Sequence, residues 1–139
     1  VITKATSIQS YAFYNCSSLT SVTIPETVTW VENYAFYGCS GLTTVTIPDK
    51  VGGIGDSAFE NCTGLTNITI GSGIRTIGKG AFKNCSNLAG AIFKKTDISW
   101  WSGSVESSME TNIGKMEYPG SNAKLLTKTY VDKYWTRGY

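Results

Sequence analysis

A block of eight residues returns four times in this chain, at one fixed interval of 23 residues. The copies read AFYNCSSL from residue 12, AFYGCSGL from 35, AFENCTGL from 58 and AFKNCSNL from 81. Periods of 20 to 50 residues are the signature of solenoids, in which each unit buries its apolar face only against its neighbours. A catalytic site needs its residues once, so the fourfold return of Ala, Phe, Cys and Leu predicts a structural role in a stack of coils.

The residues between the blocks repeat in the same phase. In the stretch LTSVTIP, apolar Val22 and Ile24 alternate with hydroxyl side chains, which is the period-2 pattern of a half-buried strand. Pro25 follows, where a missing amide donor does little harm. We therefore expect one parallel strand per coil. The columns expected to face the core are Leu19, Leu42, Leu65 and Leu88; Val22, Val45, Ile68 and Ala91; Ile24, Ile47, Ile70 and Phe93; Val28, Val51 and Ile74; and Ile8, Val31, Ile54 and Ile77.

The segment AFYNC and its copies suit a short helical turn with Ala and Phe facing inward. The residue before each Cys is Asn or Gly, the two types that most readily accept the left-handed backbone that ends a helix. Three of these residues, and Asn67, also form N-x-[ST] motifs, but glycine in the same place favours a backbone role over glycosylation. The four positions are Asn15, Gly38, Asn61 and Asn84.

The combined order IPxxVxxIxxxAFxxCxxLxxV resembles the BspA-type leucine-rich repeat, also called the Treponema pallidum type. The resemblance covers residues 1 to 93 and implies an α/β solenoid, a right-handed coil with one parallel β-strand and one short helical turn per repeat. Proteins with this repeat occur on the surfaces of bacteria and some protist parasites. Val1 aligns with Ile24, so we expect upstream coils or a cap, and a signal peptide, to lie outside the given sequence.

The four cysteines belong to the repeat and not to a metal site. Stacked coils lie about 4.8 Å apart, so the outermost two lie about 14 Å apart, whereas zinc thiolates lie about 2.3 Å from one metal. Equivalent residues in a stack point their Cβ atoms in parallel, which disfavours disulfides. We predict free, buried thiols that pack as small hydrophobes. They are Cys16, Cys39, Cys62 and Cys85.

The repeat fails after Phe93, where Lys94 replaces the proline of earlier coils. The chain is therefore divided into a leucine-rich repeat solenoid at residues 1–99 and a C-terminal capping segment at residues 100–139. Trp100 falls on the Ile77 position and is expected to close the last coil as a larger plug. Met116 falls on the Phe93 position and is expected in a final, degenerate strand.

The stretch SNAKLLTKTYVDKYW predicts an amphipathic terminal helix with Ser121 as its N-cap. The favoured interpretation is a cap that shields the apolar edge of the last coil, as solenoids require. An aromatic platform for a ligand is the alternative. The predicted apolar stripe consists of Leu125, Leu126, Tyr130, Val131 and Tyr134.

Several function classes find no support in the sequence. The chain has no histidine, which is the commonest general base and metal ligand. The stretch GSGIRTIGKG lacks the spacing of a phosphate-binding loop. The net charge is only +2 without a basic cluster, and no apolar run approaches the roughly 20 residues that cross a bilayer. We expect no enzyme activity, cofactor, metal, nucleic-acid binding or membrane insertion.

Two surfaces are candidates for binding. Outward strand positions form a hydroxyl-rich strand face, the side on which leucine-rich repeats usually bind partners, although Thr also suits any exposed strand. Aromatic residues of the first two coils form an aromatic patch, unless some of them are buried against the neighbouring coil. The strand face comprises Thr20, Ser21, Thr23, Thr43, Thr44, Thr46, Thr66, Asn67 and Thr69, and the aromatic patch comprises Tyr14, Trp30 and Tyr37 with Tyr11 and Tyr34.

The resemblance implies a secreted or surface-displayed interaction module, adhesin-like, that binds host, matrix or other surface proteins. A passive spacer or stalk of a larger surface protein is the alternative. Ice binding is a distant third, because SVT, TVT and NIT place hydroxyls at sheet spacing, but Ser21 and Asn67 interrupt that threonine array.

Overall fold

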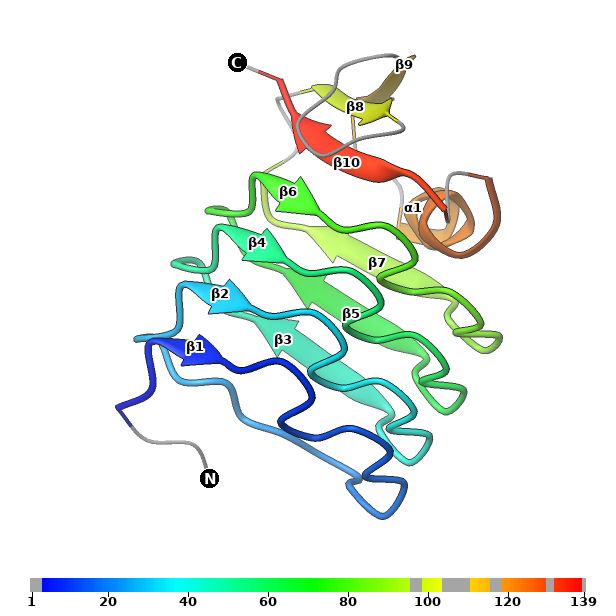
Figure 1. Cartoon of the computed structure of the whole chain (residues 1–139). Coiled ribbons are helices and arrows are strands. Elements are labelled where there is room, and N and C mark those ends of the chain that lie inside the picture. Colours follow the sequence, from blue (N-terminus) through cyan, green and yellow to red (C-terminus); the bar gives the residue numbers. More distant parts are fainter. Residues whose placement is uncertain (1–3, 96–98, 104–110, 116–118, 130–131, 139) are drawn as a thin grey trace.

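Residues 4–95, 99–103, 111–115, 119–129 and 132–138 are described by the structure, a computed structural model in which successive coils lie one above another (Figure 1). One sheet contains three parallel strands, β3 (Thr44–Ile47), β5 (Asn67–Ile70) and β7 (Gly90–Phe93). Thr44 pairs with Asn67, and Asn67 with Gly90, so each pair joins equivalent positions of two repeats. The predicted solenoid is confirmed, with its parallel strand present in these three coils, whereas residues 20–24, the expected strand of the first coil, are not a strand.

A second sheet uses a part of the coil for which the sequence predicts only a buried apolar residue. Its four parallel strands are two residues long and end at the Ile8 column. Because equivalent coils stack in register, even two extended residues find partners above and below. The strands are β1 (Ser7–Ile8), β2 (Trp30–Val31), β4 (Gly53–Ile54) and β6 (Thr76–Ile77), followed in the sheet by β10 (Tyr134–Arg137), β8 (Ser99–Gly103) and β9 (Thr111–Lys115).

The segment predicted as a short helical turn consists of consecutive hydrogen-bonded turns. The Tyr14 amide donates to the Tyr11 carbonyl three residues back at 3.2 Å, whereas the Phe13 amide donates to Ala35 of the next coil at 2.8 Å. Amides that alternate between these two partners cannot form the continuous i→i−4 ladder of an α-helix. The predicted left-handed backbone before each Cys is present, at Asn15, Gly38, Asn61 and Asn84, with φ from 56° to 72°.

The phenylalanines of the repeated block form one column through the stack. Phe36 and Phe59 lie with ring centroids 5.1 Å apart and Phe59 and Phe82 with centroids 5.5 Å apart, and within each pair the planes are within 7° of parallel. These three side chains are buried, whereas Phe13 of the first described coil is half-buried. Among the described residues, a phenylalanine with a stacked ring on both sides is therefore found only in the middle coils.

The four cysteines are free, as the spacing predicts, and three are buried. Each buried thiol donates to the phenylalanine carbonyl of the preceding coil: Cys39 to Phe13 at 3.0 Å, and Cys62 and Cys85 in the same way at 3.1 and 3.0 Å. Burial raises the pKa of Cys39 to about 11 and that of Cys85 to about 12, and it raises the pKa of Cys62 as well. The three thiols are thus neutral at physiological pH.

Thiol chemistry should follow this burial. At pH 8 we expect a water-soluble disulfide reagent to modify Cys16 rapidly in the folded protein and all four cysteines in denaturant, because Cys16 alone is partly exposed. The raised pKa values favour the folded state only while the thiols are protonated. The free energy of unfolding should therefore fall as the pH rises above the ordinary thiol value of 9.0. Rapid modification of two or more folded-state thiols would contradict this packing.

The C-terminal segment enters the second sheet in the opposite direction. Strand β10 pairs antiparallel with β6 on one side and with β8 on the other, so Trp135 lies opposite Ile77. Trp135, and not Trp100, is therefore the residue paired with Ile77 in the sheet. Trp100 lies in β8, buried, with its ring 5.4 Å from Phe93 and 6.1 Å from Trp135. The chain closes the stack by inserting a distant strand.

The predicted terminal helix forms in part. Helix α1 (Pro119–Lys124) continues as a π-helical turn, η1 (Leu125–Thr129), and buried Asn122 donates to the Ala91 carbonyl of β7 at 2.8 Å. The apolar stripe does not reach Tyr134, which lies in β10. Tyr130 and Val131 fall outside the described residues, as does Met116, although strand β9 ends just before it and runs antiparallel to β8.

Candidate functional site

Four tyrosines of the first two coils form a partly exposed aromatic surface, here named the tyrosine cluster (Tyr11, Tyr14, Tyr34 and Tyr37). Equivalent rings stack between coils, with centroids 5.1 Å apart for Tyr11 on Tyr34 and 4.9 Å apart for Tyr14 on Tyr37. Neighbouring rings within a coil are tilted, at 5.3 and 5.8 Å. Tyr11 and Tyr14 are 56% and 43% exposed. Stacking occupies the ring faces between coils, so the exposed area of Tyr11 and Tyr14 lies mainly at their ring edges.

Backbone geometry fixes one stacked pair of this cluster. Tyr11 and Tyr34 have φ of 61° and 59°, a left-handed conformation that residues other than glycine rarely adopt. The Tyr11 amide donates to the Asn33 carbonyl at 3.3 Å, and the Tyr34 amide donates to the Asp56 carbonyl at 2.9 Å. Such a conformation costs on the order of 1 kcal/mol and persists where the surrounding structure enforces it. Here the hydrogen bonds between coils hold both tyrosines in place.

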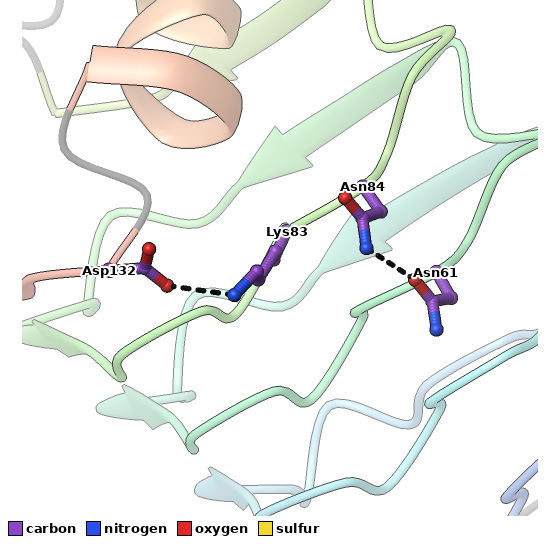
Figure 2. A network of polar contacts seen from close by, with 4 residues as sticks. All are labelled: Asn61, Lys83, Asn84 and Asp132. Carbon is purple, nitrogen blue, oxygen red and sulfur yellow. Dashed lines mark hydrogen bonds and ion pairs between the residues drawn. The ribbon is translucent and has the colours of Figure 1, made fainter.

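Two amide side chains support the other stacked pair through Tyr37. Asn61 donates to the Tyr37 hydroxyl at 2.8 Å, and Asn84 donates to the Asn61 side-chain oxygen at 2.9 Å (Figure 2). Because the Tyr37 oxygen accepts from Asn61, its own proton is left for solvent or a partner. The sequence predicts only a backbone role for these asparagines. Their return at 23-residue spacing is the signal from which a side-chain row could have been inferred.

The exposed ion pair beside this row links the coils to the C-terminal segment. Lys83 lies 3.3 Å from Asp132, with both side chains about half exposed (Figure 2). Exposed pairs of this kind contribute about 0–1 kcal/mol. Lys83 and Asp132 also line a shallow polar hollow of about 290 Å³ with Tyr34 and Glu60. The tyrosine cluster is therefore bordered by charges of both signs.

Trp30 has different neighbours from the residues of the tyrosine cluster. It belongs to β2, and its ring lies over Gly53 of the next coil, where an added Cβ would be 2.2 Å from the ring. The half-buried indole lines a small cavity of about 80 Å³ together with Tyr134 and Trp135. Gly53 is thus required by the close approach of Trp30. In this structure Trp30 packs against Gly53, Tyr134 and Trp135 and not against the tyrosines of the cluster.

The strand face points outward as predicted. Its residues in the first two repeats are all exposed, and in the third Thr69 alone is half-buried. One hydroxyl is used internally, since Thr66 donates to the Thr43 carbonyl of the coil below at 3.1 Å. Between the first two repeats, this face contains a hollow of about 320 Å³. Its exposed members are Thr20, Ser21, Thr23, Thr43, Thr44, Thr46, Thr66 and Asn67.

Within the described residues, no group of three or more Cys, Asp or Glu side chains is placed to hold a metal ion. The same part of the chain contains no helix long and apolar enough to cross a bilayer. Asp56 is engaged by structural bonds: its carboxylate accepts from the Lys79 amide at 3.0 Å and from the Tyr134 hydroxyl at 3.1 Å. The candidate sites are therefore the tyrosine cluster and the strand face, and not a cluster of buried polar side chains.

A family model, described as the BspA type leucine rich repeat region, matches residues 4–133 in six copies. The chain belongs to this family. The match extends well past Phe93, where the sequence pattern alone loses the repeat. Repeats of this class generally serve as scaffolds for protein–protein interaction.

One solved structure shares the architecture of the BspA-type chain, and a second is similar to it in sequence. A leucine-rich repeat protein from Bacteroides ovatus is 36% identical, with a TM-score of 0.61, over 63% of this chain and 23% of that one. A leucine rich cell surface protein from Faecalibacterium prausnitzii is 27% identical over 67% of this chain and 38% of that one, with a TM-score of 0.34. The chain spans less than half of either protein. No curated protein matches it.

Proposed function

We propose that this chain is a non-enzymatic protein-interaction module of a cell-surface protein, and that the tyrosine cluster is its main contact surface. The observation that carries the proposal is the set of four contiguous tyrosine rings, two of them about half exposed. Tyrosine is enriched at protein interfaces because it offers a rigid apolar ring with a polar end. The proposal includes an adhesin-like role, with host or matrix proteins as the class of partner to test first.

The rest of the chain holds the tyrosine cluster in place and covers the end of the stack. We assign residues 1–99 to the solenoid that presents the tyrosines and residues 100–139 to a capping segment. The cap is supported by buried Trp135, which lies opposite Ile77 of the last regular strand β6, and by the α1 contact to Ala91. A covered end keeps the apolar columns away from water and from other sheet edges.

The proposal is tested by a double variant, Tyr14→Ala with Tyr37→Ala. Wild type and variant are compared by surface plasmon resonance on a panel of immobilised extracellular-matrix and plasma proteins. We expect at least a tenfold loss of affinity, about 1.4 kcal/mol, for any panel protein that the wild type binds. Ile92→Ala is the matched control, because Ile92 is 47% exposed on β7 and lies outside the cluster.

Other outcomes separate the alternatives. Unchanged binding in the double variant with loss in Ile92→Ala would move the contact to the strand face and contradict the cluster. Absence of binding to any surface or matrix protein would favour a passive spacer. Thermal hysteresis in a freezing assay would be required for ice binding by the threonine array.

A further inference from the structure

The first two repeats separate on the strand face. Strand β3 is the outer strand of its three-stranded sheet, and residues 20–24, which align with it in sequence, are not a strand. No backbone hydrogen bond joins residues 20–24 to β3 among the described residues. On the opposite side of the same coils, β1 pairs with β2 in register. The two repeats are therefore joined at one sheet and open at the other.

The opening is a bounded slit and not a frayed end. At one end, Gly41 packs so tightly that an added Cβ would lie 2.6 Å from the Ser17 carbonyl oxygen. At the other end, the Gly52 amide donates to the Thr29 carbonyl at 2.8 Å. Between these closed contacts the slit has a volume of about 320 Å³. Its walls are formed by Ser21, Val22, Thr23, Ile24 and Glu26 on one side and by Thr44, Thr46 and Pro48 on the other.

The chemistry of the slit defines what fits it. An unpaired strand edge offers backbone donors and acceptors in a row, and another extended backbone satisfies such a row best. Of the eight wall residues, five are β-branched and four bear a hydroxyl group, so the walls suit small alternating side chains. Glu26 lies at the end where strands of this sheet finish. At the same position of the next repeat, the Asp49 carboxylate lies 3.3 Å from the Lys94 ammonium group. An acidic side chain at this position of the coil therefore already pairs with a basic side chain.

We propose that this slit is a binding site for one extended peptide strand, which adds to β3 parallel to the sheet and carries a basic residue at its C-terminal end, beside Glu26. The peptide has small or β-branched side chains and needs free backbone amides. This site is a different surface from the tyrosine cluster, so either can fail without the other.

The probe is a fluorescent, N-acetylated peptide TTVTIGK, which copies residues 43–47 of this chain and adds a basic end. We expect saturable binding by fluorescence anisotropy, and at least tenfold slower amide hydrogen exchange in β3 when the peptide is bound. The same peptide with N-methylated amides at alternate positions should bind at least tenfold more weakly, because its donors are removed while its side chains are kept.

Matched protein variants locate the site. Thr46→Trp fills the slit and should weaken binding at least tenfold, whereas Thr69→Trp, at the equivalent position of β5, should leave it unchanged. Circular dichroism checks that both variants are folded. The proposal is overturned if TTVTIGK does not bind, if the N-methylated peptide binds equally, or if β3 amides without peptide are already as protected as those of β5. The last result would mean that residues 20–24 close the slit themselves.

Discussion

Phe59→Ala is expected to lower the free energy of unfolding by about 3–5 kcal/mol. The Phe59 side chain is fully buried and stacks between Phe36 and Phe82, so its removal leaves a cavity that neither neighbouring ring can fill. The coils are rigidly spaced by hydrogen bonds between them, which limits collapse around the cavity. Urea denaturation followed by circular dichroism measures the change.

Phe13→Ala is the control for this prediction. Phe13 is half-buried and stacks on Phe36 alone within the described residues, at 5.1 Å, so the same deletion should cost clearly less. If Phe13→Ala and Phe59→Ala lowered the free energy of unfolding equally, the ring in the middle of the stack would be no better buried than the ring at its end. A loss below about 1 kcal/mol for Phe59→Ala would contradict the cavity argument.

Trp135→Ala should have a comparable effect of about 3–5 kcal/mol. Trp135 is buried opposite Ile77 in the sheet, and its ring meets Trp100 edge-on at 6.1 Å. Its loss would uncover the end of the last regular coil and the indole beside it. Thermal and urea unfolding of the full chain report the change, and increased binding of a hydrophobic dye would report the uncovered surface.

Tyr134→Phe is the matched control in the same strand. It removes only the hydroxyl that donates to Asp56 at 3.1 Å, so a loss of about 0.5–1.5 kcal/mol is expected. If Trp135→Ala were no more destabilising than Tyr134→Phe, residues 132–138 would be an appendage and not a cap. Dye binding should stay unchanged in the Tyr134→Phe protein.

The regular coils could be predicted because their constraint is local and repeated. Each phenylalanine of the repeated block lies beside the equivalent phenylalanine of a neighbouring coil. The 23-residue period alone therefore specifies which side chains are neighbours and which are buried. The C-terminal segment has no such period. Trp135 reaches Ile77 across a long stretch of chain, and its antiparallel entry between β6 and β8 leaves no spacing in the sequence by which it could be recognised.

The candidate surfaces were predicted in outline and not in detail. The spacing of Tyr14 and Tyr37 predicts that they stack, but the Asn61 bond to Tyr37 depends on a side-chain rotamer that no repeat pattern specifies. The slit beside β3 is the opposite case. Residues 20–24 match the later strands in sequence, so the pattern predicts a paired strand where the structure leaves an open edge.

The stacked column of rings is most directly tested by nuclear Overhauser effects between assigned phenylalanine ring protons. The account predicts contacts between Phe36 and Phe59 and between Phe59 and Phe82, and none between Phe36 and Phe82, which lie two coils apart. Contacts that skip a coil, or rings without neighbours at 23-residue spacing, would contradict the stack and with it the surfaces that the stack presents.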